Sequence, residues 1–113
     1  MTSHITVIVD SRYGSTLTLA KKIAEGAREE GAEVRLRRVA LSEPEFSVDT
    51  SRGDFIAAQT EFRELPQACA EDLEWANGII WGSPTRYGLM STPLRAFIDE
   101  IAPLWRQGAL IGK

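Results

Sequence analysis

A short run of β-branched residues near the N-terminus limits the possible folds more than any other stretch. Residues 5–9 read ITVIV, almost continuously apolar and without the alternation of a half-exposed strand. A strand of this kind is buried on both faces, which is typical of a parallel sheet covered by helices. From residue 15 or 16 to residue 30 the apolar positions change to helical spacing, with charged side chains on the other side. The chain therefore begins as a strand followed by an amphipathic helix.

The later segments repeat this alternation of strands and helices. Residues 33–39 alternate between apolar and charged side chains, and residues 78–82 (GIIWG) form another apolar run. We expect both to be strands, since strand, helix and strand in this order form a right-handed βαβ unit. Residues 72–76 and 93–101 predict helices, the second with Pro93 in its first turn. The predicted class is an α/β fold with a parallel sheet.

Several local features give more detailed expectations. Ser15 or Thr16 can serve as N-cap of the first helix, and Gly31 suits the left-handed residue after its last turn. Residues 42–70 show no sustained periodicity, yet their phenylalanines favour an ordered insertion over a linker. Among the remaining side chains, we expect core positions for Trp75 and Trp81, and solvated positions for Arg35, Arg37, Glu71 and Asp72.

The overall composition indicates one soluble domain, residues 1–113. The net charge of −3 argues against general nucleic-acid binding, which needs a basic face. No apolar run approaches the roughly 18 residues of a membrane span, and the N-terminus lacks a signal-peptide pattern. The single cysteine, Cys69, can form no internal disulfide and fits a reducing compartment. We therefore expect a cytoplasmic protein that binds neither nucleic acid nor membranes, and no spacing of acidic residues predicts a metal site.

The loop SRYGST, residues 11–16, has the composition of an anion-binding site. It stands where the first helix begins, and the N–H groups of a first helical turn, with the helix dipole, favour a phosphate. Ser11, Ser15 and Thr16 can each donate a hydroxyl hydrogen bond, and Gly14 allows the backbone a close approach. Neither the G-x-G-x-x-G dinucleotide pattern nor a Walker motif occurs. The predicted ligand is therefore a mononucleotide phosphate.

A second polar loop follows the third predicted strand, with the sequence SPTRYG at residues 83–88. In a doubly wound sheet, ligands bind outside the carboxyl ends of the strands, where the strand order reverses. If the first strand lies between the second and the third, that place lies between the loops after the first and third strands, and we expect the two loops to converge. Backbone groups of residues 84–88 can bond the polar edge of a planar ring, and Arg86 can offset negative charge on it.

These segments together resemble the flavodoxin-like NAD(P)H:quinone oxidoreductases of the WrbA type. The resemblance covers residues 5–113 and is most specific in GSPTRYG and in the terminal LWRQGALIGK. It implies a flavodoxin-like three-layer α/β/α sandwich with FMN as cofactor. By the same resemblance, Tyr13 would line the nicotinamide site, and Trp105 would lie over the substrate pocket and reach a neighbour's flavin. The implied FMN-binding residues are Ser11, Arg12, Tyr13, Gly14, Ser15 and Thr16 around the phosphate, and Pro84, Thr85, Arg86, Tyr87 and Gly88 along the isoalloxazine ring.

The implied activity is the transfer of two electrons from NAD(P)H to a quinone, in a homo-oligomer that is a dimer or a tetramer. Because the cofactor carries the redox chemistry, no side chain is predicted to be catalytic. The alternative is a flavodoxin-like FMN electron carrier without a substrate site. The insertion at residues 42–70 and the tail with Trp105 favour an oligomeric enzyme over such a carrier.

The sequence departs from the family pattern in two places. Ser15 stands where these proteins commonly have a histidine, although its hydroxyl can still donate. The chain also ends at Lys113, where the fourth strand of the family begins, so that strands four and five are missing. Either the chain is a fragment of a longer protein, with little activity of its own, or another chain covers the third strand.

Overall fold

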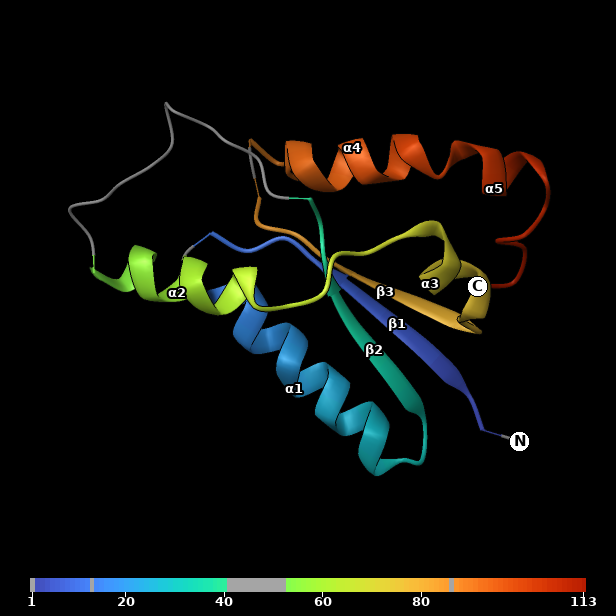
Figure 1. Ribbon diagram of the computed structural model, residues 1–113, viewed down its shortest axis with the longest axis horizontal. Helices are drawn as coiled ribbons and strands as arrows, with labels where there is room; N and C mark the ends of the chain where they lie inside the picture. The colour runs from blue at the N-terminus through green and yellow to red at the C-terminus, as the bar shows by residue number, and fades with distance from the viewer. Residues whose placement is uncertain (1, 13, 41–52, 86) are drawn as a thin grey trace.

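The computed structural model describes residues 2–12, 14–40, 53–85 and 87–113. Three parallel strands form one sheet in the order β2-β1-β3, with β1 in the centre (Figure 1). This confirms the predicted class and strand order. The elements along the chain are β1 (His4–Val9), α1 (Ser15–Glu29), β2 (Glu33–Arg38), α2 (Gly53–Arg63), α3 (Ala70–Trp75), β3 (Gly78–Gly82), α4 (Thr92–Glu100) and α5 (Ala102–Arg106).

Helices cover both faces of β1, which explains its apolar sequence. Residues 7–9 are at most 1% exposed. Thr6 turns toward α3, where its hydroxyl donates to the Asp72 carbonyl at 2.9 Å. Val9 points to the opposite face, where its Cγ2 and the Cγ2 of Thr16 in α1 would each lie 3.4 Å from a Cβ placed on Gly82. The expected α/β/α layering is therefore present. Its core contains Val7, Ile8 and Val9 of β1, Leu17, Ala20 and Ala24 of α1, Leu73 of α3, and Leu94, Phe97, Ile101 and Leu104 near the C-terminus.

Helix α1 ends as its sequence predicts. Gly31 has a φ of +92°, the left-handed conformation that glycine adopts without steric strain. Its N–H donates to the Arg28 carbonyl at 3.0 Å, and the Ala32 N–H donates to the Ala27 carbonyl at 3.1 Å. This pair of bonds is a Schellman motif, which satisfies carbonyls at the helix end and turns the chain toward β2.

Asp72 in α3 is almost completely buried, so the solvated position expected from the sequence is wrong. It is 2% exposed, and its Oδ1 accepts from Arg35 at 3.1 Å and from Arg37 at 3.3 Å. Its Oδ2 accepts from the Cys69 N–H at 3.1 Å. Desolvation lowers the pKa of Arg35, but the hydrogen bonds and charges of Glu71 and Asp72 outweigh it and leave this pKa above its ordinary value. The arginines of β2 thus bind α3 to the sheet.

Residues 53–69, between β2 and α3, lie against α1 and the end of β2. Glu61 of α2 forms an ion pair with Lys21 of α1. The N–H and the carbonyl of Arg38 both bond to the backbone of residues 66–68, at 2.9 and 2.8 Å, so this segment runs parallel to the end of β2. Residues 42–52 of the expected insertion lie outside the described residues.

The two tryptophans expected in the core are both less buried than predicted. Trp81 of β3 is 41% exposed and packs its ring against Phe97 of α4, with centroids 6.3 Å apart. It is exposed because β3, in the part of the chain that the structure describes, pairs only with β1. Trp75 is half-buried, with His4 stacked on it at 4.4 Å and the guanidinium of Arg35 at 4.1 Å from its ring.

The C-terminal segment folds back onto α3, so that the C-terminus lies beside that helix (Figure 1). The segment includes the short helix α5, which the sequence did not predict. The Nζ of Lys113 donates to the carbonyls of Leu73 and Glu74 at 2.9 and 3.0 Å. A cation at the end of a helix interacts favourably with the helix dipole and the last carbonyls. Among the described helices, none is long and apolar enough to span a membrane.

Candidate functional site

The carboxyl ends of β1 and β3 bring the two polar loops together. The Asp10 N–H donates to the Gly82 carbonyl at 3.0 Å, which joins the two chain segments just where the strands end. A Cβ placed on Gly82 would also lie 3.4 Å from the Cγ2 of Thr16, in the first turn of α1. The first turn of α1 therefore touches the end of β3, and the loop after each strand begins at the same edge of the sheet.

The first helical turn begins at Gly14, one residue earlier than the predicted N-cap at Ser15 or Thr16. Gly14 has a φ of +99° and caps the helix through its carbonyl, which accepts from the Thr18 N–H at 2.9 Å. Ser11 Oγ accepts from the Leu17 N–H at 3.2 Å, so the side chain of Ser11 caps the first turn in place of Ser15 or Thr16. The prediction was wrong because only glycine readily adopts the left-handed turn that lets the helix start here.

The start of α1 presents hydrogen-bond donors that suit an anion. Within the described residues, nothing accepts from the N–H groups of Ser15 and Thr16. Ser15 is exposed, Thr16 is half-buried, and the first turn contains no acidic side chain. Ser11 is 3% exposed and uses its oxygen as an acceptor, which leaves its proton for a ligand. Free N–H groups and hydroxyls at a helix N-terminus fit a phosphate group.

Of two further predicted residues of this loop, the structure describes Arg12 but not Tyr13. Arg12 is half-buried, and its carbonyl accepts from the side chain of Gln59 at 2.9 Å. Tyr13 lies outside the described residues. Its expected contact with nicotinamide therefore stays a prediction.

The second loop is closed at its base by Ser83. Its hydroxyl donates to the Pro84 carbonyl at 2.8 Å, and its Oγ accepts from the Ser91 N–H at 2.9 Å. These bonds hold the two ends of the loop together between β3 and α4. This role of Ser83 was not predicted from the sequence, although its place between a strand and a proline is a signal that could have suggested it.

The outer part of the second loop is exposed and conformationally unusual. Pro84 is half-buried and Thr85 exposed. Tyr87 has a φ of +53° and Gly88 a φ of +80°, so two successive residues are left-handed. A tyrosine in this conformation is uncommon, and such residues often occur at ligand sites. Tyr87 is also fully exposed, which leaves its ring available to a planar ligand. Arg86 lies outside the described residues.

Trp105 is not near these loops within one chain. It lies in α5 and is 74% exposed. Helix α4 begins at the second loop and α5 follows at its far end (Figure 1). The structure therefore does not bring Trp105 to the site of its own chain, and its expected role requires a second copy.

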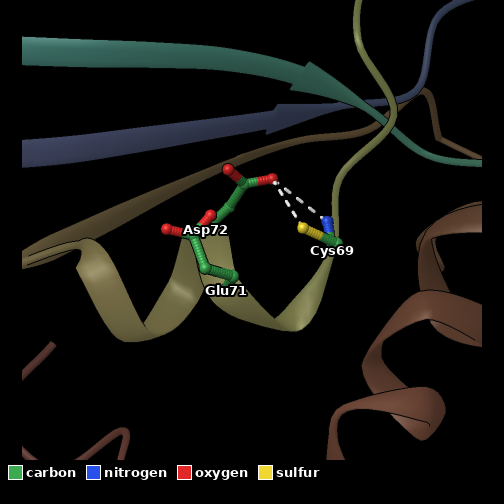
Figure 2. A group of neighbouring side chains, drawn as sticks. All are labelled: Cys69, Glu71 and Asp72. Atoms are coloured by element: carbon green, nitrogen blue, oxygen red, sulfur yellow. Dashed lines mark hydrogen bonds between the residues drawn. The ribbon is translucent and has the colours of Figure 1, made fainter.

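Cys69, Glu71 and Asp72 form a compact group whose ligand-type atoms lie within 4.8 Å of one another (Figure 2). Their contacts explain the group without a metal. Asp72 Oδ2 accepts from the Cys69 N–H at 3.1 Å and the Cys69 side chain accepts from the Asp72 N–H, which together form a capping box at the start of α3. The Sγ of Cys69 also donates to Asp72 Oδ2 at 3.5 Å. Glu71 accepts from Arg35 at 2.8 Å. We therefore assign this group a structural role, as a helix cap and an ion-pair cluster.

The parallel sheet, its strand order and the polar loops after β1 and β3 define a flavodoxin-like α/β protein. The chain belongs to the NADPH-dependent FMN reductase family, whose model matches residues 3–113. Its sequence is similar to those of proteins named NAD(P)H dehydrogenase (quinone), as the resemblance predicted.

Three of these relatives come from different organisms. The protein from Archaeoglobus fulgidus is 40% identical over 111 residues, which are 98% of this chain and 58% of the relative. The proteins from Aromatoleum aromaticum and Deinococcus radiodurans are 40% and 37% identical over 110 residues, which are 96% of this chain and 52% and 54% of theirs. The chain thus spans a little over half the length of the curated relatives that it matches.

Proposed function

We propose that the protein binds FMN and transfers two electrons from NAD(P)H to a quinone. The observation that carries this proposal is the open first turn of α1 beside the exposed loop after β3. Membership of the FMN reductase family and the names of the relatives support it. When bound, FMN supplies the redox chemistry, so the contribution of the chain is to bind, orient and polarise.

The donors at the start of α1 would hold the FMN phosphate. The N–H groups of Ser15 and Thr16 and the hydroxyls of both residues are the available donors there, with the proton of Ser11 beneath them. The helix dipole adds a partial positive charge at the same place. Gly14 would let the phosphate lie close to the backbone, because it has no Cβ.

The second loop would border the isoalloxazine ring. This loop offers backbone groups at the edge of the sheet next to the phosphate site, from Pro84, Thr85, Tyr87 and Gly88. It also offers one exposed aromatic ring, that of Tyr87. Arg86 would offset negative charge on the ring. Tyr13 would line the nicotinamide site. Trp105 would reach the site of a neighbouring subunit, which makes a homo-oligomer, a dimer or a tetramer, part of the proposal.

The direct test is oxidation of NADH or NADPH by the purified protein, supplied with FMN and benzoquinone and followed by the loss of nicotinamide absorbance. We expect oxidation that requires both FMN and the quinone. The visible spectrum of the protein would show whether FMN is retained. Bound FMN without oxidation of either nicotinamide would contradict the proposed reaction and favour an electron carrier.

Replacing Thr16 with alanine tests the phosphate site. We expect the variant to lose one hydrogen bond to a charged group, which weakens FMN binding by roughly 1.5–3 kcal/mol. Binding of riboflavin, which has no phosphate, should change little. Titrations of both flavins by fluorescence measure this difference. Thr18→Ala is the matched control, because Thr18 is exposed and lies further along the same helix than Thr16. This variant should bind FMN like the original chain. Equal FMN affinity in the two variants would contradict the assignment of Thr16 to the phosphate site.

The edge strand β3 leads to a prediction for the 113-residue chain studied alone. Ile79 and Ile80 are half-buried and Trp81 is 41% exposed, so apolar surface remains on this strand. Burial of such surface, at roughly 25 cal/mol per Å², favours association through the edge. We therefore expect the chain either to self-associate or to hold FMN weakly.

Sedimentation combined with FMN titration checks this expectation. A monodisperse monomer with submicromolar FMN affinity, better than about −8 kcal/mol, would contradict it.

A further inference from the structure

A glutamine from α2 contacts the loop proposed to bind phosphate. The Nε2 of Gln59 donates to the Ser11 carbonyl at 3.0 Å and to the Arg12 carbonyl at 2.9 Å. The two hydrogens of one amide nitrogen thus satisfy two successive carbonyls. Gln59 is separated from this loop by 47 and 48 residues of sequence, and its side chain is half-buried.

These bonds determine which way the loop backbone faces. The described peptide bonds are all trans, so the C=O and the N–H of each peptide unit point in opposite directions. With the Ser11 carbonyl turned toward Gln59, the N–H of Arg12 points away from α2. The same side chain keeps two carbonyl oxygens from turning toward a bound anion, which they would repel. A loop that presents N–H groups and hides its carbonyls is a favourable anion site.

Other contacts hold α2 against the loop. A Cβ placed on Gly14 would lie 3.3 Å from the Cβ of Ala58, so the neighbour of Gln59 packs directly beneath the turn. The ion pair between Glu61 and Lys21 joins α2 to α1. Phe62 of α2 is 3% exposed and belongs to the core. Gln59 therefore projects from a helix that is itself anchored.

We propose that Gln59 is a positioning residue, which orients the backbone of Ser11 and Arg12 before α1 for the phosphate of its ligand. This inference rests on the proposed function for the identity of the ligand, FMN. It assigns to α2 a part in binding that neither loop motif reveals. Because Gln59 acts through the backbone of the loop, its removal should affect ligands that carry a phosphate and spare those that do not.

The test compares Gln59→Leu, which removes both donated bonds, with Gln59→Glu, which keeps the size and replaces the donor by an acceptor. The matched control is Gln67→Leu, the same change at an exposed glutamine between α2 and α3. The dissociation constants of FMN and riboflavin are measured by fluorescence. Inorganic phosphate is titrated separately, with the amide resonances of Ser15 and Thr16 as the readout.

For Gln59→Leu we expect FMN affinity to fall about tenfold and riboflavin affinity to fall less than about threefold, as for two neutral hydrogen bonds. Gln59→Glu should weaken FMN further, because its carboxylate repels both the carbonyls and the phosphate. Gln67→Leu should bind both flavins like the original chain. Circular dichroism shows whether each variant is folded.

The possible outcomes separate this inference from the proposed function. Unchanged FMN affinity in both Gln59 variants, or an equal loss of FMN and riboflavin, would overturn the role of Gln59 and leave the proposed function standing. If the original chain binds phosphate but not FMN, and Gln59→Leu weakens phosphate, the role stands and the function falls. If the original chain binds neither, both are overturned. If neither variant folds, Gln59 serves folding instead, and the inference is overturned.

Discussion

Gly14→Val is expected to reduce FMN affinity by about a hundredfold. The φ of +99° at Gly14 is one that a β-branched residue rarely adopts, and enforcing it costs about 1–3 kcal/mol. In addition, any Cβ there would lie 3.3 Å from the Cβ of Ala58, which belongs to an anchored helix and has little room to move. The turn must therefore change its conformation, and the N–H groups at the start of α1 would no longer face one ligand. FMN titration of the folded variant measures the loss.

Gly31→Val is the matched control for this prediction. Gly31 has a similar φ, +92°, but nothing lies within 4 Å of a Cβ placed on it, and it stands at the other end of α1. We expect this variant to lose stability through the backbone alone and to keep its FMN affinity. A comparable loss of FMN binding in both variants would show that Gly14→Val acts through general destabilisation instead of through the site.

Asp72→Ala is expected to lower the free energy of unfolding by about 3 kcal/mol, at the low end of the range for breaking a buried ion pair. The variant leaves Arg35 and Arg37 without their buried partner and removes the acceptor of the Cys69 N–H. The value is at the low end because the two arginine side chains are 26% and 23% exposed, so water can solvate them in part. Since domains of this size are stable by only about 5–15 kcal/mol, the change should be plain in urea denaturation.

Glu71→Ala provides the comparison for Asp72→Ala. Glu71 also pairs with Arg35, but its side chain is 66% exposed. Exposed ion pairs contribute about 0–1 kcal/mol, so this variant should unfold at nearly the same urea concentration as the original chain. Similar losses in the two variants would mean that burial of Asp72 does not have the energetic importance that we assign to it.

The elements that the sequence predicted well are those with local signals. The apolar run at residues 5–9 and the helical spacing after it correspond to β1 and α1, and the predicted strands and α4 differ from the observed ones by one residue or less at each end. Gly31 was recognisable because a glycine after the last apolar turn of a helix has few other roles. The strand order followed from the rules for parallel sheets together with the family resemblance.

The predictions that failed depended on neighbours far away in the sequence. An aspartate in a short amphipathic segment is usually solvated, and only the pairing of α3 with β2 places Arg35 and Arg37 around Asp72. Trp81 lies in an apolar run, yet its exposure depends on what pairs with the outer edge of β3. In both cases the residue type was read correctly and its surroundings were not.

The sequence by itself determined the polar composition of the two loops and the order of the three strands and of helices α1, α3 and α4. Hydroxyl residues and glycine after a buried strand, and a proline-containing polar loop after another, are local patterns with a physical meaning. Only the tertiary structure decided what supports them. Gln59 looks like any polar residue of a helix, and no local pattern marks it as a residue that contacts the first loop. It becomes important because the packing of α2 brings its amide within 3.0 Å of two carbonyls that lie 47 and 48 residues away. Contacts between residues so far apart in the sequence arise from the whole fold, since they depend on the positions of the elements between the two residues.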